Sequence, residues 1–297
     1  MKIGSFNPYF AGIISGIFRP PARFFPAIPP FNAYYLAYLR ELFIFKIIHT
    51  DSYGVSVTMD DNMFDHIQVT KDGETLKIGI TSKIALITIA DFRTTAREIV
   101  IRMPELTGLD ISGASKGIVY GFETSEEMEI DVSGASELSF RDLATGDIDI
   151  DASGASFIQM TGSVQGMVVD ISGASRIELV KLSADDAELS LSGASHIEGN
   201  LNADNIDFDL SGASTALLNG SSGDIRIDAS GASRVDLPDL TVNNSDVSLT
   251  GASSASINID GKLDMSLSGA SLLNYAGTPK LGEINLSGSS TISNINE

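Results

Sequence analysis

The sequence predicts an all-β protein, a single-stranded parallel β-helix (β-solenoid) of about ten coils of 18–21 residues with an N-terminal β cap. Three observations predict this fold. The tetrapeptide S-G-A-S, or a near copy of it, recurs ten times at almost constant spacing. Apolar and polar residues alternate before each copy, as they do in a half-buried strand. A glycine occupies the second position of every copy.

The repeat is regular enough for each copy to mark one coil. Successive copies lie 21, 20, 19, 20, 19, 19, 20, 18 and 19 residues apart. Repeats of this kind are units that bury their apolar face only against a neighbouring unit. The spacing therefore predicts a stack of coils, and it leaves their handedness open. The copies begin at Ser112, Ser133, Ser153, Ser172, Ser192, Ser211, Ser230, Thr250, Ser268 and Ser287.

The alternation before each corner predicts two columns of inward side chains, because residues two apart on a strand share a face. A third apolar column follows the corner, at Ile158, Ile177, Ile197, Val235, Leu273 and Ile292. The first column is Leu109, Ile130, Ile150, Val169, Leu189, Phe208, Ile227, Val247, Met265 and Ile284. The second column is Ile111, Val132, Ala152, Ile171, Leu191, Leu210, Ala229, Leu249, Leu267 and Leu286.

The glycine of each copy is predicted to turn the chain at a corner. Glycine has no Cβ atom, so it adopts positive φ at little cost. The small residue after it leaves room where two sheets meet. These structural corner residues are Gly113, Gly134, Gly154, Gly173, Gly193, Gly212, Gly231, Gly251, Gly269 and Gly288.

Composition divides the chain into residues 1–42, 43–104 and 105–297. Residues 1–48 hold 12 of the 21 aromatic residues and 6 of the 9 prolines. Residues 1–42 lack both a small-residue cleavage site and an uninterrupted apolar span, so we expect an anchor, a signal remnant or a misassigned start. Residues 43–104 are predicted to form the N-terminal cap and first coils. The strands expected there are Tyr53–Thr58, His66–Thr70, Thr75–Ile80, Ile84–Ile89 and Glu98–Met103.

The formal charge of −20 at pH 7 limits the classes of partner. Residues 105–297 carry 30 acidic and only 8 basic side chains. Nucleic acid is therefore not an expected partner, because phosphate binding needs a basic surface. Neutral glycans, cations and cationic surfaces remain compatible with this charge. The absence of cysteine excludes disulfides and thiol chemistry.

An outward polar column lies between the first two inward columns. Stacked carboxylates repel one another, so we expect each aspartate to cap its own Ser-Gly corner or a hard cation to bind between coils. Capping is the favoured interpretation, and a calcium ladder is the weaker candidate for a metal site. The aspartates of this column are Asp110, Asp131, Asp151, Asp170, Asp209 and Asp228.

The last serine of each copy forms a second polar column. Exposed hydroxyl stacks are able to bind glycans or to order water against ice. The favoured interpretation is local, with each hydroxyl bonded to the backbone of its turn. The column is Ser115, Ser136, Ser156, Ser175, Ser195, Ser214, Ser233, Ser253, Ser271 and Ser290.

No catalytic or cofactor-binding residue is predicted, and we expect the protein not to be an enzyme. His196 occupies an outward position that other coils fill with unrelated side chains, and Arg176 and Arg234 lie three coils apart. A G-x-S-x-G nucleophile motif with partners is missing. The alternative is a carbohydrate-active enzyme similar to polysaccharide lyases, which would gather acids and bases in one groove.

The corners follow three further segments: Asp51-Ser52-Tyr53, residues 61–67 and residues 75–78. In this combination the chain resembles the auto-transporter adhesin, head GIN domain family of bacterial surface proteins, from about Phe43 to the C-terminus. The resemblance implies a β-helix similar in shape to pectin lyases but without their catalytic residues. It also implies a role in cell adhesion.

We therefore expect a non-catalytic binding or adhesion module at the cell surface, extracellular or periplasmic. Its solenoid faces would be presented to a protein or glycan partner. The export route is not indicated by the sequence. Homo-oligomers, end to end or side by side, remain an open alternative, although the polar edge of residues 283–297 would oppose uncontrolled stacking.

Overall fold

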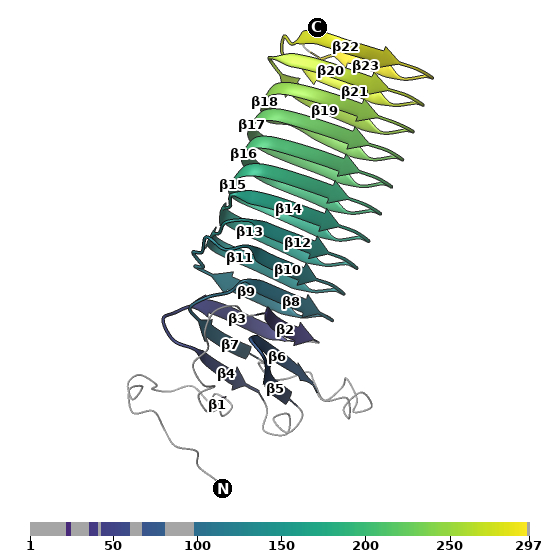
Figure 1. Cartoon of the computed structure of the whole chain (residues 1–297). Coiled ribbons are helices and arrows are strands. Elements are labelled where there is room, and N and C mark those ends of the chain that lie inside the picture. The colour runs from purple at the N-terminus through teal and green to yellow at the C-terminus, as the bar shows by residue number, and fades with distance from the viewer. Residues whose placement is uncertain (1–21, 25–35, 41–42, 60–66, 81–97, 296–297) are drawn as a thin grey trace, which may run out of the picture.

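The protein is an all-β rod in its computed structural model, which describes residues 22–24, 36–40, 43–59, 67–80 and 98–295 (Figure 1). Every secondary-structure element in these ranges is a strand, and all strands join into one sheet that winds around the rod. Within the same ranges, no helix is long and apolar enough to cross a membrane. The predicted parallel β-solenoid is confirmed.

The solenoid strands stack on strands one coil away and form two long faces. The β8 face contains β8, β10, β12, β14, the second halves of β15 to β18, β20 and β22. The β9 face contains β9, β11, β13, the first halves of β15 to β18, β19, β21 and β23. The strands are β8 (Gly108–Ser112), β9 (Lys116–Tyr120), β10 (Met128–Val132), β11 (Glu137–Ala144), β12 (Ile148–Ala152), β13 (Phe157–Ser163), β14 (Gly166–Ile171), β15 (Arg176–Leu191), β16 (His196–Leu210), β17 (Thr215–Ala229), β18 (Arg234–Leu249), β19 (Ser254–Ile259), β20 (Lys262–Leu267), β21 (Leu272–Ala276), β22 (Lys280–Leu286) and β23 (Thr291–Asn294).

The S-G-A-S corner joins the β8 face to the β9 face in every coil. All ten corner glycines have positive φ, between 72° and 86°. A Cβ atom on Gly154 would lie 2.6 Å from the carbonyl oxygen of Gly134 in the coil before. The corners therefore stack backbone on backbone, and the predicted need for glycine is confirmed for two reasons, its dihedral angle and its small volume.

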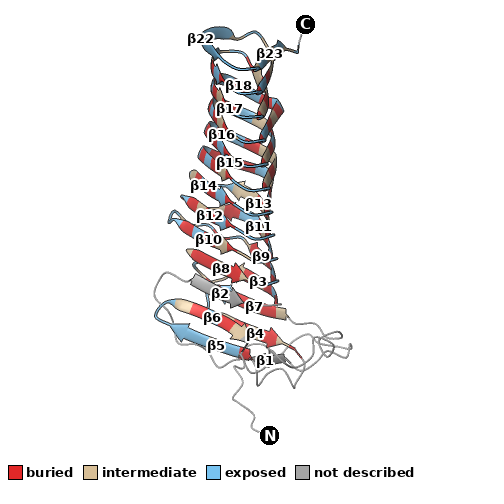
Figure 2. Cartoon of the chain, turned by 90° about the vertical axis from the view of Figure 1, so that its right-hand side faces the viewer, coloured by how far each residue is buried: buried red, intermediate tan, exposed pale blue. Residues whose placement is uncertain are grey.

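The core is one continuous cluster of apolar side chains, most of them aliphatic. Buried residues recur on the strands along the length of the rod (Figure 2). Leu109, Ile130 and Phe208 of the first predicted column are fully buried. The prediction fails in the last coil, where Ile284 and Leu286 are 44% and 53% exposed, because no described coil packs over them. Burial in a solenoid depends on the neighbouring coil, so a terminal coil cannot bury its inward residues by itself.

One coil without the S-G-A-S motif precedes the ten predicted coils. Its β2 pairs in parallel with β8, and its β3 pairs in parallel with β9. The predicted boundary after residue 42 therefore falls inside this coil, and residues 36–40 belong to the fold. The interpretation of residues 1–42 as an anchor, a signal remnant or a misassigned start stays a prediction. The two strands are β2 (Leu36–Arg40) and β3 (Ile44–His49).

Two cap strands cover this first coil at the N-terminal end of the rod, where β6 pairs in parallel with β2 and β7 pairs in parallel with β3. Antiparallel pairs complete the cap. β4 pairs with β7 and with β1, and β5 pairs with β6 in a hairpin. Four of the five strands expected in this region are present within two residues of their predicted bounds, and Ile84–Ile89 lies outside the described residues. The cap strands are β1 (Ala22–Phe24), β4 (Gly54–Thr58), β5 (Ile67–Asp72), β6 (Thr75–Ile80) and β7 (Glu98–Met103).

Candidate binding surfaces

The serine column of the corners points into the rod. Ser136, Ser195 and Ser233 are each 1% exposed. The hydroxyl of Ser214 donates to the carbonyl oxygen of Ser211 at 2.9 Å, and that of Ser253 donates to Thr250 at 2.9 Å. The local interpretation is thus confirmed. An exposed hydroxyl stack for glycans or ice is wrong, because these hydroxyls are buried from Ser115 to Ser271.

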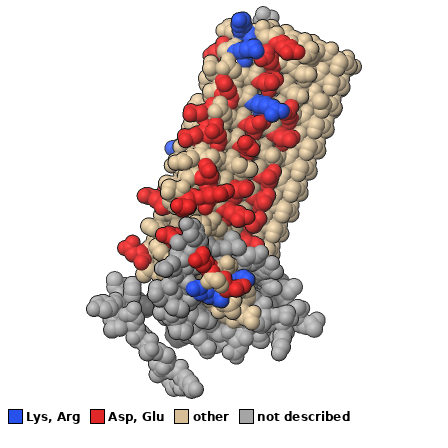
Figure 3. Space-filling model, viewed as in Figure 1, with Lys and Arg blue, Asp and Glu red and all other residues tan. Residues whose placement is uncertain are grey.

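The aspartate column lies on the outside of the β8 face and is in register. Asp110 aligns with Asp131, Asp151 and Asp170 on successive coils. A second acidic column runs beside it on the same face, so carboxylates extend along much of the rod (Figure 3). Its members are Glu129, Asp149, Glu188, Asp207, Asp246, Asp264 and Glu283.

The aspartates of the lower coils repel one another. Partial burial raises the pKa of the Asp131 carboxyl above its ordinary value, and the nearby charges of Asp110 and Asp151 raise it further. Burial and Asp170 raise the pKa of Asp151 in the same direction. Among the described residues, no hydrogen bond from the corner amides lowers the pKa of Asp131 or Asp151, as capping of the corner would have done.

The predicted capping of the corners by aspartate is wrong. In the described structure the corner amides bond to the preceding coil instead. Ser133 N donates to Ile111 O at 2.8 Å, and Ala135 N donates to Gly113 O at 2.7 Å. The stack of coils already satisfies these donors, so the aspartate side chains remain directed toward solvent.

Basic side chains on the β8 face lie at its upper end. Arg226 forms ion pairs with Asp207, at 3.6 Å, and with Asp228. Lys262 pairs with Asp264, and their hydrogen bond lowers the pKa of Asp264. The two acidic columns from β8 to β14 contain no basic residue, so negative charge is concentrated on the lower half of this face.

The described residues contain no group of three or more histidine, aspartate or glutamate side chains placed to hold a metal ion. The six aspartates of the ladder are spread one to a coil along the rod, as their register requires. A calcium ion would thus have to bridge pairs of carboxylates from adjacent coils. Calcium binding stays a prediction on that basis.

The β9 face carries a mixture of side chains that pair with their neighbours. Glu198 forms an ion pair with Arg176 and a hydrogen bond with His196, whose Nε2 lies 2.9 Å from its Oε2. The hydrogen bond from His196, together with Arg176, lowers the pKa of Glu198. Arg234 pairs separately with Asp236 at 2.6 Å. The two arginines thus have different partners, as expected from their separation.

The two described histidines have structural contacts. The ring of His49 packs edge to face on Phe122, with ring centroids 5.6 Å apart. His196 is held by Glu198 on the β9 face. His66 lies outside the described residues. The contact of His49 is with an aromatic ring and that of His196 is with a carboxylate, so neither contact pairs a described histidine with a serine or threonine nucleophile.

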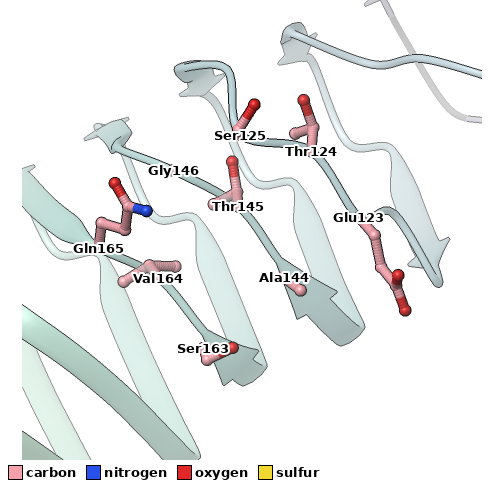
Figure 4. Close-up of a pocket in the computed structure, with 9 residues that line it drawn as sticks. All are labelled: Glu123, Thr124, Ser125, Ala144, Thr145, Gly146, Ser163, Val164 and Gln165. Atoms are coloured by element: carbon pink, nitrogen blue, oxygen red, sulfur yellow. The ribbon is translucent and has the colours of Figure 1, made fainter.

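A shallow groove of about 470 Å³ crosses three successive turns where the β9 face leads into the next coil (Figure 4). The repeat pattern did not predict this site. One signal was available, because the first repeat interval is the longest, at 21 residues, and lengthens the turn at one wall of the groove. The lining residues are Glu123, Thr124, Ser125, Ala144, Thr145, Gly146, Ser163, Val164 and Gln165.

Comparison with solved structures finds chains that align with this one over most of their length. A putative adhesin from Parabacteroides distasonis ATCC 8503 matches with a TM-score of 0.50 and 17% identity, over 92% of this chain and 96% of that one. A putative adhesin from Parabacteroides merdae ATCC 43184 matches with a TM-score of 0.49 and 14% identity, over 92% and 95%. A putative lipid binding protein from P. distasonis matches with a TM-score of 0.48 and 17% identity, over 93% and 96%. At these identities the likeness concerns the fold alone.

No curated protein matches the chain. The family described as "Putative auto-transporter adhesin, head GIN domain" matches residues 39–200 and 180–279. Together the two matches span residues 39–279, which is well over half of the chain and includes the motif-free first coil from Leu39 onward. The chain therefore belongs to the auto-transporter adhesin, head GIN domain family.

Proposed function

We propose that this chain is a non-catalytic binding module at the cell surface, which presents the faces of its solenoid to a protein or glycan partner. The observation that carries the proposal is the regular, flat, acidic β8 face, which continues from coil to coil without a deep cleft among the described residues. Membership of an adhesin family supports the same function and a surface or extracellular location.

The alternative is a carbohydrate-active enzyme, for which acids and bases should meet in one groove. Glu123 is the single ionisable residue that lines the groove described above. The one described acid that contacts two basic side chains on the β9 face, Glu198, is engaged by Arg176 and by His196 outside the groove. Both observations favour binding over catalysis.

The charge of the β8 face limits the partners that it would accept. The carboxylates between β8 and β14 have no basic residue in their columns. Their combined negative potential repels anionic surfaces and attracts cationic ones. We therefore expect partners of this face to be neutral or basic. Attraction between exposed charges should weaken as ionic strength increases.

The experiment that tests the function measures binding and turnover together. The purified chain is applied to a glycan array and to surface-protein extracts immobilised on beads, and the same saccharides are incubated with it and analysed for new reducing or unsaturated ends. Retention without product is the expected result. Formation of product would favour the enzyme, and failure to bind any saccharide or protein would remove the proposal.

A further inference from the structure

We propose that the groove lined by residues 123–125, 144–146 and 163–165 is a binding site for a neutral saccharide. This inference rests on the proposed binding function and names the ligand class of one site. Three turns on adjacent coils build the groove, and their residues align in columns across it (Figure 4). The ligand would lie over the middle turn, between side chains of the outer two.

The groove is hollow because the middle turn carries small residues. Ala144 aligns with Glu123 on one side and with Ser163 on the other. Gly146 likewise lies between Ser125 and the turn of Gln165, whose N–H donates to Gly146 O at 2.8 Å. The outer turns are two coil spacings apart, about 10 Å. This opening admits a ring-shaped ligand.

The middle turn, residues 144–146, forms the floor of the groove, and at Gly146 this floor consists of backbone alone. A Cβ atom on Gly146 would collide with the carbonyl oxygen of Ser125, so the floor cannot carry a larger side chain there without moving the first turn. Thr145 points inward, is 6% exposed, and its hydroxyl donates to the carbonyl oxygen of Glu126 at 3.0 Å. This bond ties the middle turn to the first turn and fixes their relative position.

Addition of a peptide strand to the groove is not supported, because neighbouring turns use the backbone of the floor. Ala144 N donates to Phe122 O at 2.9 Å, and Ala144 O accepts from Thr124 N at 2.8 Å. Gly146 O accepts from Gln165 N. Recognition by strand addition needs an edge with free N–H and C=O groups. The ligand must therefore be recognised by side chains.

The side chains of the walls suit a ligand that is rich in hydroxyl groups. Ser125 and Ser163 each offer a hydroxyl that donates and accepts, and the amide of Gln165 does both with separate atoms. Glu123 adds an acceptor. Sugar hydroxyls also donate and accept, so they can bond to both walls at once. The groove volume of about 470 Å³ is large enough for a small saccharide.

Charge selects a neutral saccharide over an anionic one. Glu123 is the sole ionisable residue of the lining, and it is acidic. Glu126, Glu127 and Asp147 are exposed carboxylates in or beside the same turns. Sulfated or sialylated saccharides would be repelled by these groups. The walls contain no basic side chain that would compensate for them.

The test uses the full chain and a printed array of neutral, sulfated and sialylated oligosaccharides, followed by calorimetric titration with the neutral saccharide that is best retained. Ala144→Phe fills the hollow and should weaken binding by at least about tenfold. Gln165→Ala removes one bonding group and should weaken it by about two- to tenfold. Thr241→Phe is the matched control, because residue 241 occupies the same column on a distant coil.

The control should bind as the wild type does, and all variants should keep the same circular dichroism spectrum. Retention of no neutral saccharide, preference for the anionic ones, or full affinity in Ala144→Phe would each overturn the proposal. Adhesion to whole cells separates this result from the wider function. A chain that adheres to cells but binds no saccharide loses the groove proposal alone, whereas a chain that does neither loses both.

Discussion

The ring of Phe45 occupies the space into which a side chain at Gly117 would project. The two residues align on neighbouring parallel strands, β3 and β9, and Phe45 is fully buried. A Cβ atom on Gly117 would collide with the end of the ring. The next coils carry Leu138 and Ile158 at the same position, where they fill the core. In the first coil with the S-G-A-S motif, Gly117 has no side chain to fill the core. The ring of Phe45 on the neighbouring strand β3 fills this space.

We predict that Gly117→Ala destabilises the protein by about 1–3 kcal/mol, the usual cost of overpacking a core. Phe45→Leu removes the end of the ring, so in the double variant the cost of Gly117→Ala should largely disappear. Urea unfolding of the four proteins measures the coupling. Gly79→Ala is the control, since a Cβ atom there meets nothing within 4 Å. Additive effects of the two changes would contradict the packing relationship.

The stacked corners lead to a second prediction. Gly193 has a φ of 75°, and a Cβ atom there would lie 2.7 Å from the carbonyl oxygen of Gly173. Gly193→Ala should therefore cost more than about 2 kcal/mol, since the left-handed conformation alone costs about 1–2 kcal/mol for a residue with a side chain. The expected result is a lower melting temperature. The neighbouring Ala194→Ser is the control, because the last corner already has Ser289 there. Equal stability of the two variants would exclude this explanation.

Ser245 provides a prediction of the opposite sign. Its side chain points into the core and is 4% exposed, and its hydroxyl has no hydrogen-bond partner among the described residues. Adjacent coils place Ile225 and Leu263 at the same position. Ser245→Ala should raise the free energy of unfolding by about 1 kcal/mol, because an unsatisfied buried hydroxyl costs about 1–3 kcal/mol.

Ser253→Ala is the matched control for that experiment. The Ser253 hydroxyl is equally buried but bonds to the carbonyl oxygens of Thr250 and Ala229 at 2.9 and 3.1 Å. Its removal leaves acceptors without this donor and should lower the stability. Thermal unfolding of the two variants side by side checks the contrast. A loss of stability in both would mean that Ser245 has a bonding role.

The regular part of the fold was predictable from local rules. Period-two alternation places Leu109 and Ile111 inside, and ten evenly spaced glycines mark the corners. The same alternation holds after the corner. Ser156 lies two residues before the buried Ile158, so the rule places the Ser156 side chain inside the rod, as the structure has it. The polarity of serine alone suggests an exposed hydroxyl. Inside the rod, however, the serine hydroxyls find backbone carbonyl acceptors at the corner, so they are buried with their hydrogen bonds made.

The irregular parts could not be predicted from spacing. The coil of Leu36–Arg40 and Ile44–His49 has no S-G-A-S motif, and only its pairing with β8 and β9 reveals it. The groove depends on the relative size of side chains that are about twenty residues apart, such as Glu123 and Ala144. A repeat pattern predicts which positions align, but it does not predict where one coil is hollow beside its neighbours.

Calcium provides a test of the aspartate ladder. We predict that saturating calcium changes the melting temperature by less than about 1–2 °C relative to chelator, because calcium takes six to eight oxygen ligands and the described carboxylates do not gather in threes. Magnesium at equal ionic strength controls for screening. A clear rise with calcium alone, lost in Asp131→Asn, would instead place an ion between the coils.

The raised pKa values of Asp131 and Asp151 predict how stability depends on pH. A carboxyl whose pKa is higher in the folded than in the unfolded state stabilises the fold fully below the unfolded value, 3.8, and this contribution is lost as pH rises through the folded pKa. The double variant Asp131→Asn, Asp151→Asn should therefore be more stable than wild type at pH 7. After allowance for solvent screening, the gain is on the order of 1 kcal/mol or less.

Asp264→Asn is the control of opposite sign. Its hydrogen bond with Lys262 lowers the pKa of Asp264, so its stabilising contribution is present at pH 7 and is lost as pH falls through that lowered pKa. This variant should be less stable than wild type at pH 7. Melting curves from pH 3 to pH 8 measure both effects. They are recorded with and without NaCl at about 0.5 M, a concentration that screens interactions between exposed charges. Salt should reduce the gain of the double variant, because it screens the repulsion between coils. A double variant no more stable than wild type at pH 7 and low salt would mean that the ladder does not strain the fold.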